Sequence, residues 1–397
     1  SEESGLLSAI ALGEKSDLDA KVKDMFLGAG IVHILAVSGL HISLICMGLY
    51  RILKGRGFSF AVSGGLASFV AVMYVIMAGM SVSSLRAGGM FLIYMLSQVL
   101  GENYDMATSL GVMAILLLVK NPMYITNTGF VFSFCAMASV LFVARPLGKM
   151  YSEYADLRKE SKVLTLGLNA KHQVSLKDRA LKGIFSSLIF SFGITLGMLG
   201  VTCYLNYQFP VVSVGLNFLL LPFLPALLGF GLAGGITGCF CSGFGEILLM
   251  PCHVILETDE WIADKASLMP GAVMICGKPT LCRAVIYTVL QILLVRIVSE
   301  KRLNPLKAVM AAKNEAKNRL VFTVIMMTAL TLIVLIPSRT HFEGDVLDVG
   351  QGDGIFIRSD EGVNFFIDGG STNEKQVGKY RILPFLKYKG AEKIDYW

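Results

Sequence analysis

Long apolar runs separated by short polar segments make up most of the chain. Ten of these runs carry few or no charged residues and reach or approach about 20 residues, the length of a helix that crosses a bilayer. They fall at 31–50, 58–80, 87–100, 106–119, 129–147, 184–204, 212–233, 236–256, 280–299 and 320–336. The pattern predicts a mainly α-helical, polytopic membrane protein of about ten spans. Its two short runs, 87–100 and 106–119, are expected to be tilted helices, half-helices or one re-entrant pair.

The pattern changes near residue 338. Residues 344–370 alternate apolar and polar positions with a period of two and break at glycines, which indicates two or three strands with a hairpin-like turn at 359–362. We therefore expect an amphipathic or soluble lead-in at 1–30, a polytopic domain at 31–338, and the start of a β-rich or α/β domain at 339–397. Residues 257–271 are predicted to form an amphipathic segment on the outer membrane surface.

Composition supports the membrane assignment. Hydrophobic residues make up 54% of the chain, charged residues 16%, and the mean hydropathy is +0.64, which excludes an ordinary soluble domain. The eight cysteines lie mainly in apolar runs without a CxxC pair, so we interpret them as small hydrophobic residues.

The basic residues gather in three clusters between the apolar runs, and these predict the orientation. One follows the first span, one fills the loop after the fifth, and one precedes the last span: Arg51, Lys54 and Arg56; Lys149, Arg158, Lys159, Lys162, Lys171, Lys177, Arg179 and Lys182; Lys301, Arg302, Lys307, Lys313, Lys317 and Arg319. With ten spans all three clusters lie on one side, which the positive-inside tendency assigns to the cytoplasm. Residues beyond about 338 are then outside, and the net charge of +6 is weak evidence for a nucleic-acid partner.

The stretch IVHILAVSGLHISL, residues 31–44, places His33, Ser38, Gly39 and His41 in the first apolar run. The two histidines lie on neighbouring parts of one helix face, with Ser38 and Gly39 between them. This small pair permits a close helix contact or a break in the helix. One interpretation is that the small residues allow close helix packing while the histidines bond to neighbouring carbonyls. The other is that these polar groups line a water-filled path, because ionisable groups that face lipid are costly. Without cysteine or carboxylate neighbours the two histidines make a poor metal site.

Other polar residues near the predicted spans pose the same question. Ser84 and Arg86 lie at the start of the third span, where the guanidinium would either reach the interface or face a pore and hold an anion. Asn127 is expected at a helix contact, and Asn217 in a proline-interrupted span of the kind that exposes backbone carbonyls to a cavity. Glu246 lies near the centre of its predicted span, so we expect it to face inward or be protonated.

The C-terminal segment carries Asp348, Asp353 and Asp368 at predicted strand ends. Carboxylates there hold a metal or position a metal ligand in some proteins, but they are also ordinary turn formers, which the spacing alone favours. The spacing of Gly350, Gly352 and Gly354 does not match a dinucleotide loop, because no helix is predicted to follow; a tight turn is favoured.

Several of these motifs together resemble the ComEC competence family. MFLGAGIVHILAVSGLHISLICMGLYRIL resembles the signature of the family, and GMSVSSLRAGGM, NPMYITNTGFVFSF and FPVVSVGLN follow in the expected order. The resemblance implies an inner-membrane channel that passes single-stranded DNA into the cytoplasm during natural transformation. It implies as partners the lipid bilayer and other competence proteins, namely a DNA receptor and a cytoplasmic helicase or translocase.

The tail VLDVGQGDGIFIRS…NFFIDGG resembles the first strands of a metallo-β-lactamase-like domain, whose motif would include Asp348, Gln351, Asp353, Asp368 and Gly369. Such a domain uses zinc or manganese held by a run of histidines and aspartates. His341 is the only histidine beyond residue 253, so we expect no catalytic residue, metal or cofactor within these 397 residues.

Two alternatives remain open at this point. A secondary transporter of a small solute would explain broken helices and Glu246. A membrane-anchored metallohydrolase would use its spans only as a tether and would tolerate substitutions at 31–44. For a DNA channel we expect a polar, mostly neutral lining with positive charges at the mouths, because each phosphate carries a charge that hydrocarbon cannot solvate.

Overall fold

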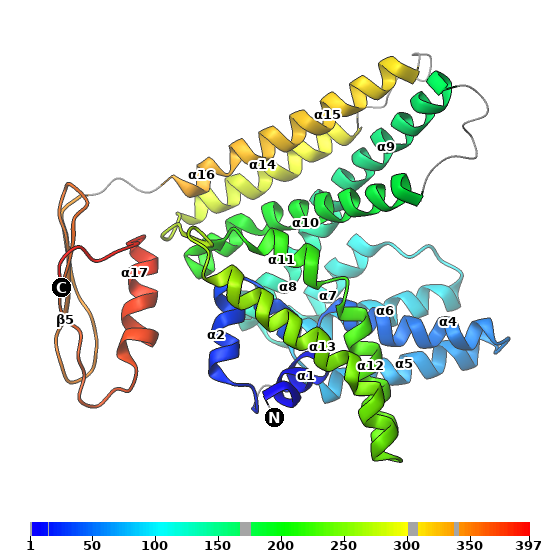
Figure 1. Ribbon diagram of the computed structural model, residues 1–397, viewed down its shortest axis with the longest axis horizontal. Helices are drawn as coiled ribbons and strands as arrows, with labels where there is room; N and C mark the ends of the chain where they lie inside the picture. The colour runs from blue at the N-terminus through cyan, green and yellow to red at the C-terminus, as the bar shows by residue number, and fades with distance from the viewer. Residues whose placement is uncertain (1, 15, 167–175, 301–308, 337–340) are drawn as a thin grey trace. The chain divides into compact units, whose positions relative to one another are not determined.

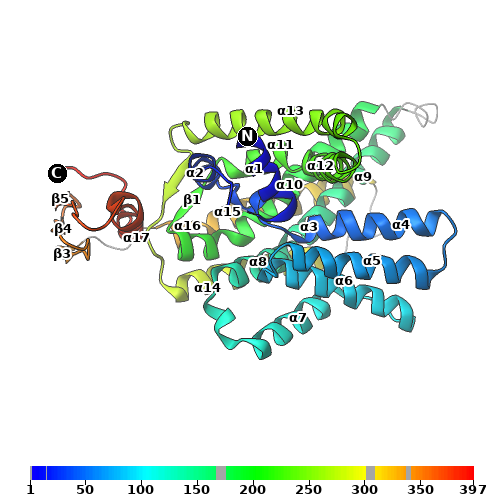
Figure 2. The same cartoon turned by 90° about the horizontal axis from the view of Figure 1, so that it is seen from below.

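The computed structural model describes residues 2–14, 16–166, 176–300, 309–336 and 341–397 and is mainly helical (Figures 1 and 2). The chain divides into two compact units. Unit 1 comprises residues 1–141 and 210–272, and unit 2 comprises residues 142–209 and 273–397. Residues 1–30 therefore belong to unit 1, and the described part of 339–397 belongs to unit 2. The domain boundaries predicted at residues 30 and 338 stay predictions.

Unit 1 consists of helices, most of which are apolar. In chain order these are α1 (Glu2–Leu12), α2 (Ala20–Gly28), η1 (Val32–Leu35), α3 (Gly39–Ile42), η2 (Ser43–Met47), α4 (Gly48–Gly55), α5 (Phe60–Met77), α6 (Val82–Leu100), α7 (Met106–Lys120), η3 (Pro122–Thr126), α8 (Thr128–Ser139), α11 (Ser213–Leu220), α12 (Leu224–Gly238) and α13 (Ser242–Ser267). Several of these helices begin at a polar residue whose side chain accepts a hydrogen bond from a backbone N–H of the first turn, among them α5, α6, α7 and α8 at Ser59, Ser81, Asp105 and Asn127. These N-caps satisfy donors that the helix leaves free, so the local sequence sets where each helix starts.

Glycine allows two pairs of helices in unit 1 to pack closely. A Cβ atom at Gly88 of α6 would lie 2.6 Å from a methyl carbon of Val75 on α5. A Cβ atom at Gly245 of α13 would lie 2.6 Å from the Cα atom of Gly238 on α12. Because small residues let helix backbones approach closely, these contacts are the kind that holds helices together where water is absent.

The first predicted span, 31–50, is wrong as a continuous helix. Residues 32–35 form the 3-10 turn η1, the chain is extended at Ala36 and at Ser38, and α3 starts afresh at Gly39. A single π turn, η2, then joins α3 to α4. The interruption follows from Ser38, because its side chain accepts a hydrogen bond from the N–H of Leu40 and so begins a new helix instead of continuing the old one.

The prediction of ten spans is not confirmed. Among the described residues, five helices are long and apolar enough to cross a membrane: Phe60–Met77, Thr128–Lys162, Leu181–Asn206, Leu281–Glu300 and Val309–Leu335. The pair α11 and α12, bent by 48°, would be a sixth. Helix α7, with 15 residues, belongs to the shorter apolar class, so its predicted span of 106–119 is too short to cross without tilting.

Unit 2 contains a helical bundle. Its helices are the π turn η4 (Val140–Ala144, which begins in unit 1), α9 (Arg145–Leu166), α10 (Leu176–Asn206), α14 (Leu281–Glu300), α15 (Val309–Leu330) and α16 (Leu332–Leu335). Two buried polar side chains connect them: the Tyr287 hydroxyl donates to the carbonyl of Leu196 at 2.8 Å, and the Gln291 amide donates to the carbonyl of Met327 at 2.8 Å. Both bonds satisfy polar groups inside an otherwise apolar core.

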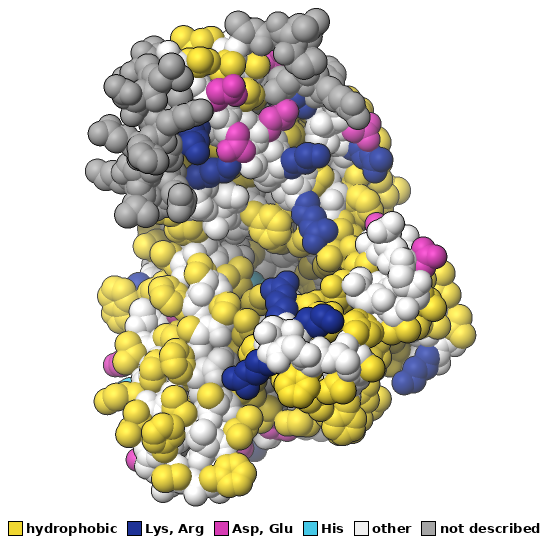
Figure 3. All heavy atoms as spheres, turned by 90° about the vertical axis from the view of Figure 1, so that its right-hand side faces the viewer, with side chains coloured by type: hydrophobic (Ala, Val, Ile, Leu, Met, Phe, Trp, Pro, Cys, Tyr) yellow, Lys and Arg dark blue, Asp and Glu magenta, His cyan; other side chains and the backbone are white. Residues whose placement is uncertain are grey.

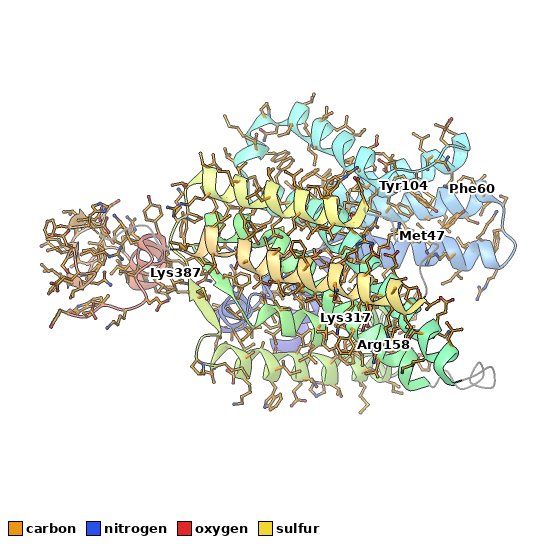
Figure 4. All side chains as sticks on the ribbon, turned by 90° about the horizontal axis from the view of Figure 1, so that it is seen from above. Met47, Phe60, Tyr104, Arg158, Lys317 and Lys387 are labelled. Carbon is orange, nitrogen blue, oxygen red and sulfur yellow. The ribbon has the colours of Figure 1, made fainter. Side chains whose placement is uncertain are left out.

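The segment after the fifth predicted span is not a loop at its start, because α8, η4 and α9 run on as one helix. The basic residues Arg158 and Lys159 therefore lie on α9, packed along α15. Arg158 and Lys317 lie at the same end of the bundle (Figure 4), where Lys182 at the start of α10 pairs with Asp156 at 2.6 Å. Two of the predicted basic clusters thus share one end of unit 2. Lys171, Lys301, Arg302 and Lys307 lie outside the described residues.

The C-terminal segment confirms the predicted strands. Strands β3 (Glu343–Val346), β4 (Gly354–Arg358) and β5 (Asn364–Asp368) form an antiparallel sheet in the order β3-β4-β5, and the predicted turn joins β4 to β5. A π turn, η6 (Gly378–Ile382), and α17 (Leu383–Lys389) follow. The sheet and helix share a small core that contains Phe356, Phe366 and Ile382. A separate two-stranded sheet pairs β1 (Gln208–Pro210) with β2 (Val273–Ile275).

Candidate functional site

The interrupted segment around Ser38 and His41 is held by a hydrogen-bond network. His41 is fully buried, and its Nε2 atom lies 3.0 Å from the carbonyl oxygen of Ile10. Since a carbonyl only accepts, Nε2 carries the proton, and Nδ1 accepts from the N–H of Ser38 at 3.2 Å and faces its hydroxyl at 3.0 Å. The neutral tautomer of His41 satisfies both contacts, so in this conformation the imidazole connects elements and is not exposed. Its role in lining a path stays a prediction.

The partner of His41 is the end of helix α1. The last carbonyls of a helix have no partner within it, and here two of them bond to side chains from later in the chain. His41 donates to Ile10, and the Tyr74 hydroxyl of α5 donates to the carbonyl of Ala11. Gly13 then ends the helix with a φ of +78°. The sequence pattern did not single out Tyr74, although its spacing from Ala67 and Ala71 places it on the buried face of α5.

His33 differs from His41 in its surroundings. Its flanking residues Ile34 and Leu35 are buried, whereas His33 keeps accessible surface although the surrounding protein desolvates its imidazole, which hydrogen-bonds to the carbonyl of Gly30. The structure therefore separates two residues that the sequence pattern placed together. Of the two histidines, His33 is the one whose side chain is available to a ligand in this conformation.

Two interrupted helical segments meet beside His33, although about 180 residues separate them along the chain. The residues Ile31, Ile34 and Leu35 share one core with residues of α11 and α12. A Cβ atom at Gly30, whose φ is +74°, would lie 2.2 Å from Pro210, so only glycine permits this approach. The same region of the unit appears in Figure 2, where α1, α2, α11 and α13 are neighbours.

Asn217 lies at this meeting point, on α11 just before the bend. Its side-chain oxygen is buried and has no hydrogen-bond partner among the described residues. The backbone carbonyl of Asn217 accepts the N–H of Leu221, which is the last bond before the helix breaks. The predicted break is confirmed by the 48° bend. An unsatisfied buried acceptor is costly, which makes Asn217 a natural contact for a polar ligand.

Arg86 is a buried cation on α6, and it is only 7% exposed. Its Nε atom donates to the hydroxyl of Ser133 on α8 at 2.8 Å, and its guanidinium lies 5.9 Å from the ring centre of Phe134. Among the residues that the structure describes, no carboxylate pairs with it. The Arg86 guanidinium is therefore buried in this conformation and does not extend to the membrane interface, which was one of the two predicted alternatives. Neither Ser133 nor Phe134 was predicted to contact it.

Two predicted path residues near Arg86, Ser84 and Gly39, make local hydrogen-bond or packing contacts, and their role in lining a path stays a prediction. Ser84 is fully buried and donates to the carbonyl of Ser81 at 2.8 Å. Gly39 of α3 faces α6, because a Cβ atom at this position would touch Ala87 at 3.9 Å. The small residues of the signature thus allow α3 to lie against the helix that carries Arg86.

Two predicted path residues lie at the protein surface. Asn127 is exposed and caps α8 by accepting the N–H of Phe130 at 3.1 Å. Glu246 is also exposed, so it does not face inward in this structure, and the other expectation, that it is protonated, stays a prediction. The reason for the exposure is that α13 begins at Ser242, not at residue 236 as predicted, which places Glu246 near the start of the helix instead of at its centre.

A buried acid that the sequence pattern misplaced lies further along α13. The predicted surface segment 257–271 is largely a continuation of this helix, which runs through Pro251 to Ser267. Asp259 is 7% exposed, and its burial raises the pKa of the carboxyl to about 7. Its position among the buried Cys252, Leu256 and Ala263, at spacings of three and four, would have indicated this.

The predicted motif of the C-terminal segment forms two loops that bond to each other. Asp348 pairs with Arg381 at 2.9 Å, and the carbonyl of Asp353 accepts the N–H of Gly369 at 2.9 Å. Gln351 contacts Thr372, and Asp368 accepts the N–H of Gly370. The carboxylates of Asp348 and Asp368 are thus engaged in an ion pair and a turn, whereas Asp353 contributes its backbone carbonyl. Within the described ranges, no group of three or more His, Cys, Asp or Glu side chains is arranged to hold a metal.

Charged side chains are sparse on the helical surface. Figure 3 shows one face on which lysine and arginine side chains stand among mainly hydrophobic ones. Many large hydrophobic side chains of the helices are exposed, for example Val119 at 78% and Phe240 at 89%. Such a surface is unstable in water and is typical of helices that contact lipid.

Comparisons with known proteins agree on one relationship. The family model described as "Competence protein" matches residues 10–301. The chain is 24% identical over 410 aligned residues to "ComE operon protein 3" of Bacillus subtilis (strain 168). The alignment covers 99% of this chain and 47% of that relative, so the chain spans about half of its length. No solved structure matches the chain significantly.

Proposed function

Since the chain belongs to the competence protein family, we propose that it forms a passage in the inner cell membrane through which single-stranded DNA enters the cytoplasm. By this proposal the helices are multi-pass spans, their basic ends are cytoplasmic, and residues beyond 338 lie outside. The partners are single-stranded DNA, the bilayer, and the receptor and helicase or translocase of the competence machinery. The chain matches only 47% of the length of its Bacillus subtilis relative. The proposal therefore concerns the part that this chain plays in DNA uptake.

The observation that carries the proposal is the meeting of two broken helical segments, 30–42 and 213–224, in unit 1. Backbone that is not helical is tolerated at membrane depth only where it is buried in protein or lines a water-filled cavity. Transport proteins use such breaks to present polar groups at a substrate site. His33, which is exposed, and Asn217, with its unsatisfied oxygen, are the polar side chains at this point.

Arg86 provides the attraction for phosphate. A guanidinium with no carboxylate partner among the described residues keeps its charge available to an anion, while Ser133 fixes its orientation. Phe134 beside it offers a ring on which a base can stack. One buried cation within a mostly neutral surrounding attracts a polyanion without holding it permanently.

Transport by the full-length protein in liposomes tests the proposal. We expect Arg86→Ala and His33→Leu each to reduce the passage of single-stranded DNA at least ten-fold. Arg86→Lys should retain part of the activity, because it keeps the charge but loses the bond to Ser133. Glu246→Gln is the matched control, since Glu246 is exposed at the start of α13. Unchanged transport in both Arg86→Ala and His33→Leu, at normal protein levels, would exclude these residues from the path.

The bend between α11 and α12 also supports a second candidate, a secondary transporter of a small solute. Such a protein would show solute uptake that follows a proton gradient in the absence of DNA. Uptake of this kind, together with no passage of DNA, would favour the transporter.

We propose that residues 339–397 are the first strands of a metallo-β-lactamase-like domain. The support is the antiparallel order β3-β4-β5 and the two bonded loops that carry the motif residues. Asp348 is engaged by Arg381 and Asp368 by Gly370, and the described residues bring together no group of three or more metal-binding side chains. Zinc or manganese therefore stays an expectation for a complete domain. A membrane-anchored hydrolase would show activity in the isolated complete domain and tolerance of substitutions at 31–44.

A further inference from the structure

Two cysteine thiols lie in contact in unit 2, far apart in sequence. The Sγ atoms of Cys203, on α10, and Cys276, directly after β2, are 3.4 Å apart. We propose that these two residues form a disulfide bond in the mature protein. A disulfide requires sulfur atoms about 2 Å apart, so a closure of little more than 1 Å is needed.

The pair lies where the chain leaves and re-enters unit 2, so a bond there would link these two crossings. The chain leaves unit 2 after Phe209 and returns at Val273, and the helices α11 to α13 lie between these points. Strands β1 and β2 pair at the two crossings, and the N–H of Cys276 donates to the carbonyl of Tyr207 at 2.9 Å. A covalent bond from Cys203 to Cys276 would join the outgoing and the returning chain beside this short sheet.

The pair lies at the end of the bundle that the proposed orientation puts outside the cell. Lys182 marks the basic end of α10, and Cys203 lies 21 residues further along the same helix, which is about 31 Å at the helical rise. This length equals the thickness of the hydrocarbon core. The basic end is assigned to the cytoplasm, so the thiols reach the opposite face, where disulfides form and persist.

The two thiols differ in a way that suits stepwise oxidation. Cys203 is fully buried, whereas Cys276 is partly exposed. The thiol of Cys203 donates a hydrogen bond to the sulfur of Cys276, which stabilises the thiolate and lowers the pKa of Cys276. The accessible cysteine is therefore the better nucleophile, and the buried one is positioned to resolve the intermediate.

The reaction is a thiol–disulfide exchange with a protein disulfide of the oxidase class as the oxidant. The Cys276 thiolate attacks one sulfur of that disulfide, forms a mixed disulfide and releases one thiolate. Cys203, once deprotonated, attacks the Cys276 sulfur, forms the internal bond and releases the second thiolate. The pair loses two electrons and two protons, and the oxidant disulfide is reduced to two thiols.

Peptide mapping of the full chain tests the proposal without any substitution. Membranes are collected into acid with N-ethylmaleimide, the protein is digested without reductant, and the peptides are identified by mass. We expect a linked pair that contains Cys203 and Cys276, and its disappearance after reduction. Recovery of both peptides as N-ethylmaleimide adducts from membranes of aerobically grown cells would overturn the proposal.

Thiol counting in variants provides an independent measurement. In denatured, unreduced protein we expect six of the eight cysteines to react with a maleimide–polyethylene glycol reagent. Cys203→Ser and Cys276→Ser should each show seven, because one cysteine of the pair is lost and its former partner becomes reactive. Cys282→Ser, which removes an exposed cysteine, should show five. Eight reactive thiols in the unsubstituted protein and seven in Cys282→Ser would contradict the bond.

Discussion

Replacement of His41 by leucine is the substitution that best separates a structural from a path-lining role. Leucine cannot donate to the carbonyl of Ile10 or accept from the N–H of Ser38, and both bonds are buried or partly buried. A buried polar group left without a partner costs about 1–3 kcal/mol. Two such groups, offset in part by the apolar replacement, predict a loss of about 3 kcal/mol in the free energy of unfolding. For a unit of about 200 residues this lowers the melting temperature by roughly 6–12 °C.

The matched control is His33→Leu in the same segment. His33 keeps accessible surface and its imidazole makes one bond to a carbonyl, so its loss should cost less than about 1 kcal/mol. Thermal unfolding of both variants in the same detergent measures the difference. DNA passage is then measured well below the melting temperature of each variant. We expect His41→Leu to pass DNA normally per folded molecule and His33→Leu to pass less. Equal stability of the two variants would refute the structural role of His41.

Three further substitutions test the packing and the buried charges. Gly245→Ala should destabilise unit 1 by about 1–3 kcal/mol, because its Cβ would meet backbone atoms of Gly238 that cannot move aside; Gly243→Ala, which has open space, should have no effect on thermal unfolding. Asp259 has its pKa raised to about 7 in the folded protein, so the folded state binds a proton more tightly than the unfolded state and stability falls as the pH rises from about 4 to 7. Asp259→Asn should thus stabilise the protein at pH 8, on the order of 2 kcal/mol, and change little at pH 4; an equal shift of melting temperature at both pH values would contradict this. Tyr287→Phe removes the bond to Leu196 and should cost about 1 kcal/mol in chemical unfolding, and a loss above about 3 kcal/mol would mean that the hydroxyl has a further partner.

Local signals predicted several elements well. The strands at the C-terminus alternate with a period of two, and the turn residues between β4 and β5 are plain in the sequence. The predicted runs 58–80 and 106–119 begin within two residues of α5 and α7, whose starts are set by the caps at Ser59 and Asp105. In both cases the relevant interactions join residues a few positions apart, so the sequence contains them directly.

The errors arose where hydropathy hides backbone geometry. The break before Gly39 leaves the run as apolar as an unbroken helix, and only the Ser38 cap signalled it. The turn between α12 and α13 consists of apolar and small residues, so the predicted helix start was six residues early and Glu246 was misplaced.

Contacts between distant residues could not be predicted from the pattern. His41 bonds to Ile10, and Arg86 bonds to Ser133 on another helix. Nothing in the local sequence distinguishes Ile10 or Ser133 from its neighbours in the chain. Each becomes a hydrogen-bond partner only through the way the helices pack. The sequence therefore identified the polar residues of the candidate site but not which of them are exposed.

The split of unit 1 along the chain has a consequence for biosynthesis. The core that surrounds Ile31 and Leu35 includes side chains of α11, α12 and α13, which begin 74, 85 and 103 residues after the end of α8 (213, 224 and 242 minus 139). At about 5–20 residues per second this is a delay of roughly 10 s. During that interval the amino-terminal helices are already in the translocon or bilayer with their partner surface uncovered, so a chaperone or insertase that shields this surface should raise the yield of folded protein.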